Sequence, residues 1–357
     1  MNKRPTIKDV AKKTGLSLST VSLVINKSGY VSEKTREKVL KVVKELDYHP
    51  SRAARGLASR TSGNIGFILS EDHFSRAEPF YTKIFLGTEF EARNHNFYIL
   101  LTTVDTLSKK ELAIPRFLLE RNVDGVIIAG KMDTKLVDYV ERLDIPLILV
   151  DFRIPGRRVS TVMIDNRKGV RLAIEHLAER GHTRIAFVGG DPGHPSISER
   201  FQGYRETLEE LRLPFDENLV VTSEVALRVE DGFHALRTIF EREGKPTAVF
   251  AANDAMAIGC IQYAKHAGLQ IPRDLAVVGF DDVESTLHVD PRLTTVRVFK
   301  EEMGALAVRR LVEAVKSKSR NIVDTYVPVE LIVRESTMGR TPGDGVPKGV
   351  EIPEMQD

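Results

Sequence analysis

The feature that most restricts the fold of this chain is a repeated alternation of short apolar segments with amphipathic helical segments, from residue 65 to about residue 338. Such alternation predicts parallel β-sheets flanked by helices. The region is too long for one comfortable sheet, so we expect two lobes that divide near Ile164 and Asp165. A ligand would then lie between them, beside the carboxyl ends of the strands. The expected strands are residues 65–69, 98–102, 125–129, 147–150, 185–188, 248–251 and 276–279.

The residues before this region predict a separate, all-helical unit. Apolar residues recur at helical spacing across residues 6–47, which indicates three helices separated by short turns. Thr6 can cap the first helix, Gly15 can end it and Ser17 can cap the second. The sequence therefore predicts a helix-turn-helix head.

The second predicted helix has two different sides. Val21 and Val24 face the core, and the opposite side carries Ser19, Thr20 and Ser22. Small polar side chains on a helix surface can approach base edges in the major groove closely. The alternative is a plain three-helix bundle without a partner.

Charge is distributed very unevenly along the chain. Residues 1–60 contain 14 Lys and Arg against 5 Asp and Glu, a net charge of +9, whereas the remainder carries −7. A compact basic head favours DNA binding, because bound Lys and Arg release counterions condensed on the duplex. A solvated basic surface without a partner has the same composition, so charge alone leaves both interpretations open.

Composition narrows the class of protein. The 357 residues, 42% of them hydrophobic, can bury the cores of two or three domains. The single cysteine, Cys260, excludes a disulfide framework and a multi-cysteine metal site, and it suits a reducing compartment. Residues 1–13 lack the apolar run of a secretory signal, and no apolar stretch has membrane-spanning length. We expect a cytoplasmic protein with no metal or cofactor.

Two further segments have compositions of their own. Pro50 can start a helix over residues 50–58 that is too short to be stable alone, and a polar linker follows it. The tail from Gly339 is rich in Gly, Pro and charge, which predicts disorder rather than an oligomerising helix. The predicted domains are a helix-turn-helix head (1–49), a hinge helix and linker (50–63), a two-lobed effector-binding and dimerisation domain (64–338) and a disordered tail (339–357).

Residues 6–62 resemble the DNA-binding head of the LacI/GalR family of transcriptional regulators. The resemblance rests on Ala11, Gly15, Ser17, Thr20, Val21, Ser22, Asn26, Val31, Ser32, Thr35, Arg36, Leu46, Asp47, Tyr48, Pro50 and residues 55–58. It implies that Leu18, Ser19 and Leu23 occupy base-reading positions. It also implies a set of phosphate-contacting residues, which are Thr6, Ser17, Ser22, Asn26, Ser32, Thr35 and Tyr48.

Leu23 departs from the family pattern, in which arginine is common. Leucine cannot make the bidentate contact with guanine that arginine makes. We expect this position to read a thymine methyl group or no base, and the half-site to differ from the usual family sequence.

The hinge segment also resembles that of the family, in which a helix folds on specific DNA. The resemblance places Leu57 as an apolar wedge beside Ala54 and Arg55, and it implies a central pyrimidine-purine step in a palindromic operator. In the alternative interpretation, Leu57 packs on the effector-binding domain.

Residues 64–338 resemble the type I periplasmic-binding-protein fold. The matching landmarks are residues 79–81, 124–128, 145–151, 181–182, 200, 203–204, 253–254, 279–282, 293–296 and 333–336. The resemblance implies seven effector-contacting residues, which are Phe80, Tyr81, Asp151, Ser196, Arg200, Asn253 and Asp281. An arginine fork, carboxylate acceptors and an aromatic face suit a polyhydroxylated ligand. Asp254 is expected to cap the helix that begins at Ala255, and Asp282 to be a loop residue.

The resemblance favours a sugar as the effector. Val298 and Lys300 stand where some sugar-responsive members have a polar and an aromatic residue. A purine-like or phosphorylated effector, to which Lys300 would contribute, is therefore the alternative. Whether the effector releases or strengthens DNA binding is not indicated by the sequence.

Two other functions share the predicted fold. An enzyme would need a nucleotide-binding or catalytic motif, but residues 189–193 fit neither a dinucleotide fingerprint nor a Walker loop, and His176 and His182 are expected to be structural. A transport receptor would need export and would lack the basic head. We predict a homodimeric, non-enzymatic regulator, a repressor of carbohydrate-utilisation genes, that binds a double-stranded DNA operator under the control of a small-molecule effector.

Overall fold

A computed structural model describes residues 5–26, 29–48, 61–71, 79–105, 113–222, 227–242, 245–317 and 321–338. The chain divides into two compact units. The first holds residues 1–64 with 121–124, and the second holds the remainder. The predicted hinge residues Ala54, Arg55 and Leu57 and the tail from residue 339 lie outside the described residues.

The first unit contains the predicted helix-turn-helix. Its helices are α1 (Ile7–Thr14), α2 (Leu18–Ile25) and α3 (Glu33–Glu45). At the start of α1, the Asp9 carboxylate accepts hydrogen bonds from the backbone N–H and the hydroxyl of Thr6, both at 2.7 Å. Gly15 ends α1 with φ +67°, a conformation that L side chains rarely adopt, and Ser17 Oγ accepts the Thr20 N–H at 3.1 Å to start α2. The predicted turn and caps are therefore confirmed.

A single small core holds these three helices together. Helices of eight residues are marginal alone in water, so packing rather than propensity keeps them folded. The buried members of this core are Val10, Ala11, Val21, Val24, Val39, Val42 and Tyr48.

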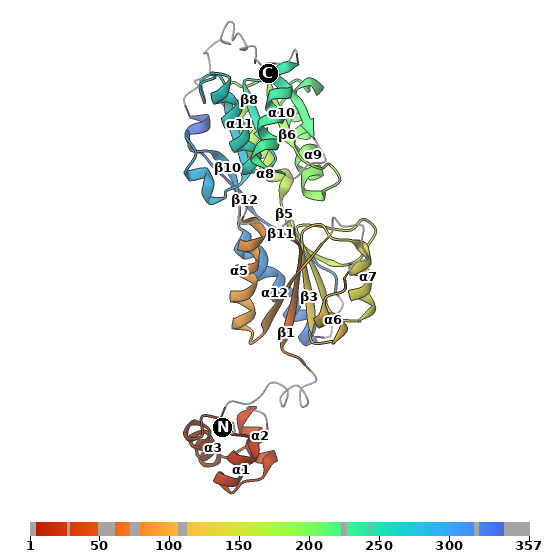
Figure 1. Ribbon diagram of the computed structural model, residues 1–357, viewed down its shortest axis with the longest axis vertical. Helices are drawn as coiled ribbons and strands as arrows, with labels where there is room; N and C mark the ends of the chain where they lie inside the picture. Colours follow the sequence, from red (N-terminus) through yellow and green to blue (C-terminus); the bar gives the residue numbers. More distant parts are fainter. Residues whose placement is uncertain are drawn as a thin grey trace. The chain divides into compact units, whose positions relative to one another are not determined.

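The first lobe of the second unit contains a six-stranded sheet with the order β11-β5-β4-β3-β1-β2. The pairs that join β1, β3, β4, β5 and β11 are parallel. Figure 1 shows α5 and α12 on one side of this sheet and α6 and α7 on the other. The strands are β1 (Asn64–Ser70), β2 (Tyr98–Val104), β3 (Gly125–Ala129), β4 (Leu147–Val150), β5 (Ser160–Ile164) and β11 (Asp324–Val327), and the helices are α5 (Phe80–Asn94), α6 (Arg116–Leu119), α7 (Thr134–Arg142) and α12 (Lys300–Ser317).

The second lobe contains a sheet with the order β12-β10-β9-β8-β6-β7, parallel except for β12, which runs antiparallel to β10. Its strands are β6 (Ile185–Gly189), β7 (Val220–Thr222), β8 (Ala248–Ala251), β9 (Ala276–Asp281), β10 (Thr294–Val298) and β12 (Val329–Ile332), and its α-helices are α8 (Asn166–Glu179), α9 (Pro195–Glu210), α10 (Val229–Glu241) and α11 (Asp254–His266). All seven predicted strands are confirmed, whereas β5, β7, β10, β11 and β12 were missed. None of the helices in the described ranges is long and apolar enough to cross a membrane.

The chain passes between the lobes three times, after β5, after β10 and after β11. The predicted division at Ile164 and Asp165 coincides with the first crossing. The other two were not predicted, because α12 and β11 continue the same alternating pattern without a break. The first lobe is thus completed by residues from late in the sequence, and α12 packs so closely on α5 that a Cβ added at Gly87 would lie 1.9 Å from the Glu301 carbonyl oxygen.

Candidate nucleic-acid interface and ligand cleft

Helix α2 presents an exposed face to solvent. Leu18 is 44% exposed and Leu23 is 38% exposed, and Ser19 is exposed as well. Residues 18, 19, 22 and 23 lie on one side of a helix, because neighbours on a helix surface are three or four residues apart. The three predicted base-reading residues therefore share one face of α2, opposite the valine core.

Two of the predicted phosphate-contacting hydroxyls, Ser17 and Ser32, cap helices, and Thr20 was predicted only to lie on the DNA-facing side of its helix. Ser17 and Thr20 bring their hydroxyl oxygens within 2.9 Å of each other at the start of α2. Ser32 and Thr35 do the same, also at 2.9 Å, at the start of α3. Unpaired N–H groups and the helix dipole favour an anion at such a place. The head thus offers two helix N-termini suited to phosphate.

Other predicted DNA contacts are placed differently. Asn26 is exposed, and its Nδ2 donates to Ser22 Oγ at 3.1 Å. Tyr48 lies in the core of the head and is only 6% exposed, so only a small part of it can reach a phosphate. Tyr30, which was not singled out from the sequence, is 97% exposed just before α3.

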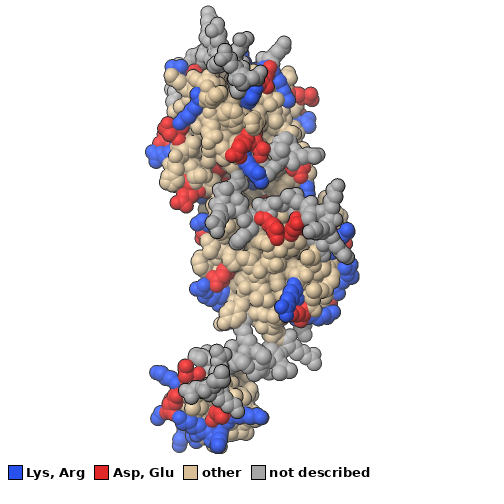
Figure 2. All heavy atoms as spheres, in the orientation of Figure 1, with Lys and Arg blue, Asp and Glu red and all other residues tan. Residues whose placement is uncertain are grey.

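The basic charge of the head is displayed on its surface. Figure 2 shows Lys and Arg side chains gathered over the head helices on the face in view. Lys8, Lys12 and Lys34 are exposed, while Lys13 pairs with Glu45 at 3.0 Å and lowers the pKa of that carboxyl. An excess of exposed cations on so small a unit fits a polyphosphate backbone.

Asp151 connects the two lobes of the second unit. It follows β4, and its carboxylate accepts hydrogen bonds from the Tyr81 hydroxyl at 2.8 Å and the Ser196 hydroxyl at 2.7 Å. Tyr81 belongs to α5 in the first lobe, but Ser196 belongs to α9 in the second, so its bond with Asp151 joins the two lobes at the predicted effector site. Lys131 forms a second link between the lobes, an ion pair with Asp191 at 3.0 Å.

Arg200 is held rigidly on the second lobe. It is 4% exposed, its Nε donates to Asn166 Oδ1 at 2.9 Å, and one Nη donates to the backbone oxygen of Ala252. The other Nη lies 3.5 Å from Asp281 Oδ1, and the guanidinium lies 3.7 Å from the centre of the Phe280 ring. Such a fixed fork is suited to two adjacent hydroxyl groups.

The ionisable groups of the cleft perturb one another. Burial raises the pKa of Asp281 to about 6, against the opposing influence of Arg200 and Lys300. Burial also lowers the pKa of Lys300, whose ammonium donates to the backbone oxygens of Asp281 and Asp282. Arg200 and Lys300 therefore lie among the carboxylates of Asp151, Asp254, Asp281 and Asp282, so both cations are already compensated and the place suits a neutral ligand. Within the described ranges, no three His, Cys, Asp or Glu side chains are grouped as a metal site requires.

Three of the positive-φ residues of the described chain are aspartates at this place. Asp151 has φ +61°, Asp281 has φ +111° and Asp282 has φ +52°. Each such conformation costs on the order of 1–3 kcal/mol for an L-residue and persists only where the surroundings enforce it. Strain of this kind accumulates at functional sites, which favours the predicted role of the two cleft carboxylates.

The end of β8 differs from the sequence prediction. Asn253, not Asp254, caps α11, and its Oδ1 accepts the Met256 N–H at 2.9 Å. Asn253 has the extended backbone that a capping residue requires, whereas Asp254 is already helical. The predicted cap was therefore wrong. The Asp254 carboxylate instead accepts the Val283 N–H at 2.9 Å and the Thr295 hydroxyl at 2.5 Å.

The remaining cleft residues lie at its border. Phe80 is half-buried and packs edge-on against Tyr81, with ring centres 5.0 Å apart. His194 was missed by sequence reasoning; its Nδ1 accepts the Ser196 N–H at 3.3 Å at the start of α9, and burial lowers its pKa. Asp282 lies in a loop, as predicted, but it is not a plain loop residue, because its carboxylate pairs with two arginines.

Comparison with known families yields two matches. Residues 6–51 match the model described as bacterial regulatory proteins, lacI family. Residues 174–337 match the model described as a periplasmic binding protein-like domain.

Full-length relatives and solved structures are similar as well. The ribose operon repressor of Halalkalibacterium halodurans is 34% identical over 94% of this chain and 97% of its own length. The regulator CelR of Thermobifida fusca is 35% identical over 94% of this chain and 98% of its own length. A CelR–cellobiose complex has a TM-score of 0.70 at 33% identity and covers 93% of this chain and all of its own. A lac repressor dimer bound to operator and the anti-inducer ONPF has a TM-score of 0.77 at 28% identity and covers 94% and 100%.

Proposed function

The chain belongs to the lacI family of bacterial regulatory proteins, and we propose that it is a repressor that binds a palindromic operator as a homodimer and responds to a sugar. The observation that carries the proposal is one chain that combines an exposed, basic helix-turn-helix with a buried cluster of hydrogen-bond donors and acceptors between two lobes. The regulated genes are those of carbohydrate use.

In this proposal, the exposed face of α2 enters the major groove. Leu18, Ser19 and Leu23 contact base edges, and the hydroxyls at the starts of α2 and α3 contact phosphates. Tyr30 adds a contact beside them. The hinge residue Leu57, flanked by Ala54 and Arg55, wedges into the central step of the operator.

The effector lies in the cleft, where Arg200 donates to hydroxyl groups and Asp151 and Asp281 accept from them. The relatives named as a ribose operon repressor and as a CelR–cellobiose complex support a sugar. Lys300 gives its ammonium protons to two backbone carbonyls, which favours a neutral sugar over a phosphorylated effector.

The chain acts without catalysis in the cytoplasm. The similar proteins reported above are named as regulators and repressors, and the two histidines singled out in the sequence have structural partners: His176 contacts Thr337 and His182 contacts Thr247. A homodimer is supported by exposed apolar side chains on α5 and the edge strand β2, which are Phe90, Tyr98 and Leu101.

The proposal is tested with the purified full-length protein. We expect tighter binding to a selected palindromic duplex than to a scrambled one, a steep loss of affinity with salt, and a rise of Tm with a sugar from a panel. Equal affinity for the two duplexes would rule out the operator-binding part. A panel in which no sugar changes Tm or operator affinity would rule out the effector class.

Leu23 provides a sharp prediction for the operator sequence. Binding-site selection with the wild type is expected to show no guanine preference at the base pair that residue 23 reads, because leucine offers only an apolar contact. Leu23→Arg is expected to create a guanine preference of about 1–3 kcal/mol at that base pair alone. Leu40→Arg, which places the same arginine at an exposed position of α3 outside the predicted base-reading set, serves as the matched control and is expected to leave this base pair without a guanine preference. A strong wild-type guanine preference at this base pair contradicts the prediction.

A further inference from the structure

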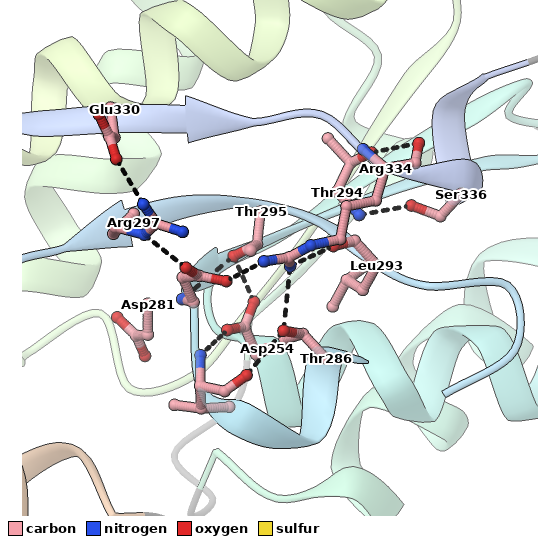
Figure 3. A network of polar contacts seen from close by, with 12 residues as sticks. Asp254, Asp281, Thr286, Leu293, Thr294, Thr295, Arg297, Glu330, Arg334 and Ser336 are labelled. Atoms are coloured by element: carbon pink, nitrogen blue, oxygen red, sulfur yellow. Dashed lines mark hydrogen bonds and ion pairs between the residues drawn. The ribbon is translucent and has the colours of Figure 1, made fainter. Parts of the chain in front are cut away.

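We propose that Asp282 is a positioning residue that links the effector-binding Asp281 to the two late crossings between the lobes. The proposal rests on the proposed function, since it concerns how occupancy of the cleft is transmitted. It arises from a polar network in the second lobe that is buried around Asp282 and Arg334 and exposed at Arg297 and Glu330 (Figure 3).

The Asp282 carboxylate is shared by two arginines. Arg297 Nε donates to Asp282 Oδ2 at 2.6 Å, and an Nη of Arg334 donates to Asp282 Oδ1 at 2.6 Å. The Asp282 and Arg334 side chains are nearly buried, so this pair is poorly screened by water and salt. One carboxylate oxygen thus accepts a hydrogen bond from β10, and the other accepts one from the segment that follows β12.

Both arginines are fixed by further contacts. Arg334 donates to the Leu293 backbone oxygen at 2.8 Å and to the Thr286 hydroxyl at 3.0 Å, and Arg297 donates to Glu330 at 2.7 Å. Figure 3 shows Arg297, Glu330 and Arg334 around the loop that follows Asp281. Asp282 therefore belongs to a connected set of hydrogen-bonded side chains and is held in place by it.

The backbone of this loop is held as well. The Asp282 N–H donates to the Thr295 hydroxyl at 3.3 Å, and the Val283 N–H donates to Asp254 at 2.9 Å. Asp281 and Asp282 both have positive φ, so the loop stores strain that these contacts must enforce. Loss of the Asp282 carboxylate would release the turn that aims Asp281 into the cleft.

The network is placed beside two crossings. Arg297 precedes the last residue of β10, after which the chain crosses to α12, and Glu330 is the second residue of β12, just after the chain returns from β11. Arg297 and Glu330 are directly paired in the antiparallel register of β10 and β12. A shift of Asp281 is therefore transmitted through Asp282 to both crossing strands.

The first test uses hydrogen exchange of the ligand-free full-length protein, because this readout needs no known effector. Asp282→Asn keeps the side-chain shape but removes the charge. We expect exchange to be at least about 10-fold faster in the loop at 282–283, at the first turn of α12 and in β12, but unchanged in β8 and α11. Faster exchange confined to 282–283 would reduce Asp282 to a local loop anchor and overturn the proposal.

Two variants keep the result interpretable. Asp216 of the second lobe also pairs with an arginine, Arg184, at 3.2 Å. Asp216→Asn removes the charge of that carboxylate and is expected to leave hydrogen exchange at both crossings unchanged. Arg297→Gln removes the more exposed of the two cations and gives the same test in a milder variant, should Asp282→Asn fail to fold. Unchanged exchange at the crossings in Arg297→Gln also overturns the proposal.

The second test separates this proposal from the proposed function. Ribose and cellobiose are added to wild type and Asp282→Asn, and operator affinity is measured with and without each sugar. If either sugar changes the operator affinity of the wild type, we expect the effect of that sugar on the variant to be smaller by about 10-fold or more. Without sugar, the operator affinity of the variant is expected to stay within about 2-fold of the wild-type value. A full response in the variant overturns the link. A wild type that ignores both sugars counts against the effector class, and hydrogen exchange still decides the link.

Discussion

Arg200→Met is expected to lower effector affinity by about 100-fold or more and the stability of the second lobe by about 3–5 kcal/mol. The side chain is almost completely buried, and its guanidinium satisfies Asn166, the Ala252 carbonyl and Asp281 at once. Methionine fills a similar volume but donates no hydrogen bond. Asp281 would then be a buried carboxylate without its arginine, and an uncompensated buried charge destabilises the folded state.

The two effects of this substitution are measured separately. Unfolding in urea reports the loss of stability, and titration with the sugar found to bind the wild type reports affinity at a temperature where the variant is folded. Arg184→Met removes an arginine from a partly exposed pair on the same lobe and is expected to change stability by less than about 1 kcal/mol. The effector affinity and the stability of Arg200→Lys should lie between those of the wild type and Arg200→Met, because an ammonium group keeps the charge but cannot reproduce the guanidinium fork. Wild-type sugar affinity in Arg200→Met contradicts an effector role for Arg200.

Local sequence patterns predicted the parts of the fold that depend on neighbouring residues. The strands β3, β4 and β8 are short apolar runs with turns at both ends, and their predicted bounds match. Thr6, Gly15 and Ser17 were predictable for the same reason, since a cap is set within four residues. The edge strands β7 and β11 are only three and four residues long, with partly exposed side chains, so they lack the continuous apolar signal of a buried strand.

The cleft depends on contacts between distant residues, which no local pattern encodes. Asp151 meets Ser196 across 45 positions, and Arg334 meets Asp282 across 52. Family resemblance identified Asp151, Ser196, Arg200 and Asp281, and the structure brings these together. It did not identify the Asp282 pairs, because a carboxylate after a strand has the same local sequence whether it is solvated or buried. The cap of α11 was assigned to Asp254 instead of Asn253 for a similar reason: both residue types are good caps, and only the backbone conformation decides between them.

Backbone strain and buried charge at the effector site both reduce the stability of the folded state. Three aspartates have positive φ there, and carboxylates lie away from water beside Arg200 and Lys300. Such a site is stabilised by the rest of the fold and is retained for binding. Substitutions that relieve this cost should therefore stabilise the fold and weaken the effector response together.

Asp281→Asn is the clearest case. We expect the variant to be more stable than the wild type by up to about 3 kcal/mol above pH 7, because Arg200 keeps its hydrogen bonds to Asn166 and to the Ala252 carbonyl when Asp281 loses its charge. The folded-state pKa of Asp281 is about 6, against 3.8 for an ordinary aspartate, because burial disfavours the carboxylate. The stability that this group contributes is therefore present below pH 3.8, where it is neutral in both states, and is lost as the pH rises through 6. Asparagine stays neutral throughout, so the advantage of the variant should grow between pH 4 and pH 7 and vanish below pH 4.

The same titration predicts the pH dependence of binding. A carboxylate accepts hydrogen bonds from two hydroxyls, whereas its protonated form is a poorer acceptor. Wild-type sugar affinity should therefore fall about 10-fold from pH 7.5 to pH 5, one unit below the Asp281 pKa. Asp281→Asn should bind the sugar weakly at both pH values. Asp290→Asn, which changes a highly exposed carboxylate on the same lobe, should behave as the wild type in both assays. If Asp281→Asn bound the sugar as tightly as the wild type, Asp281 would not be an effector acceptor, and if it gained no stability at pH 8, the carboxylate would not carry a burial cost.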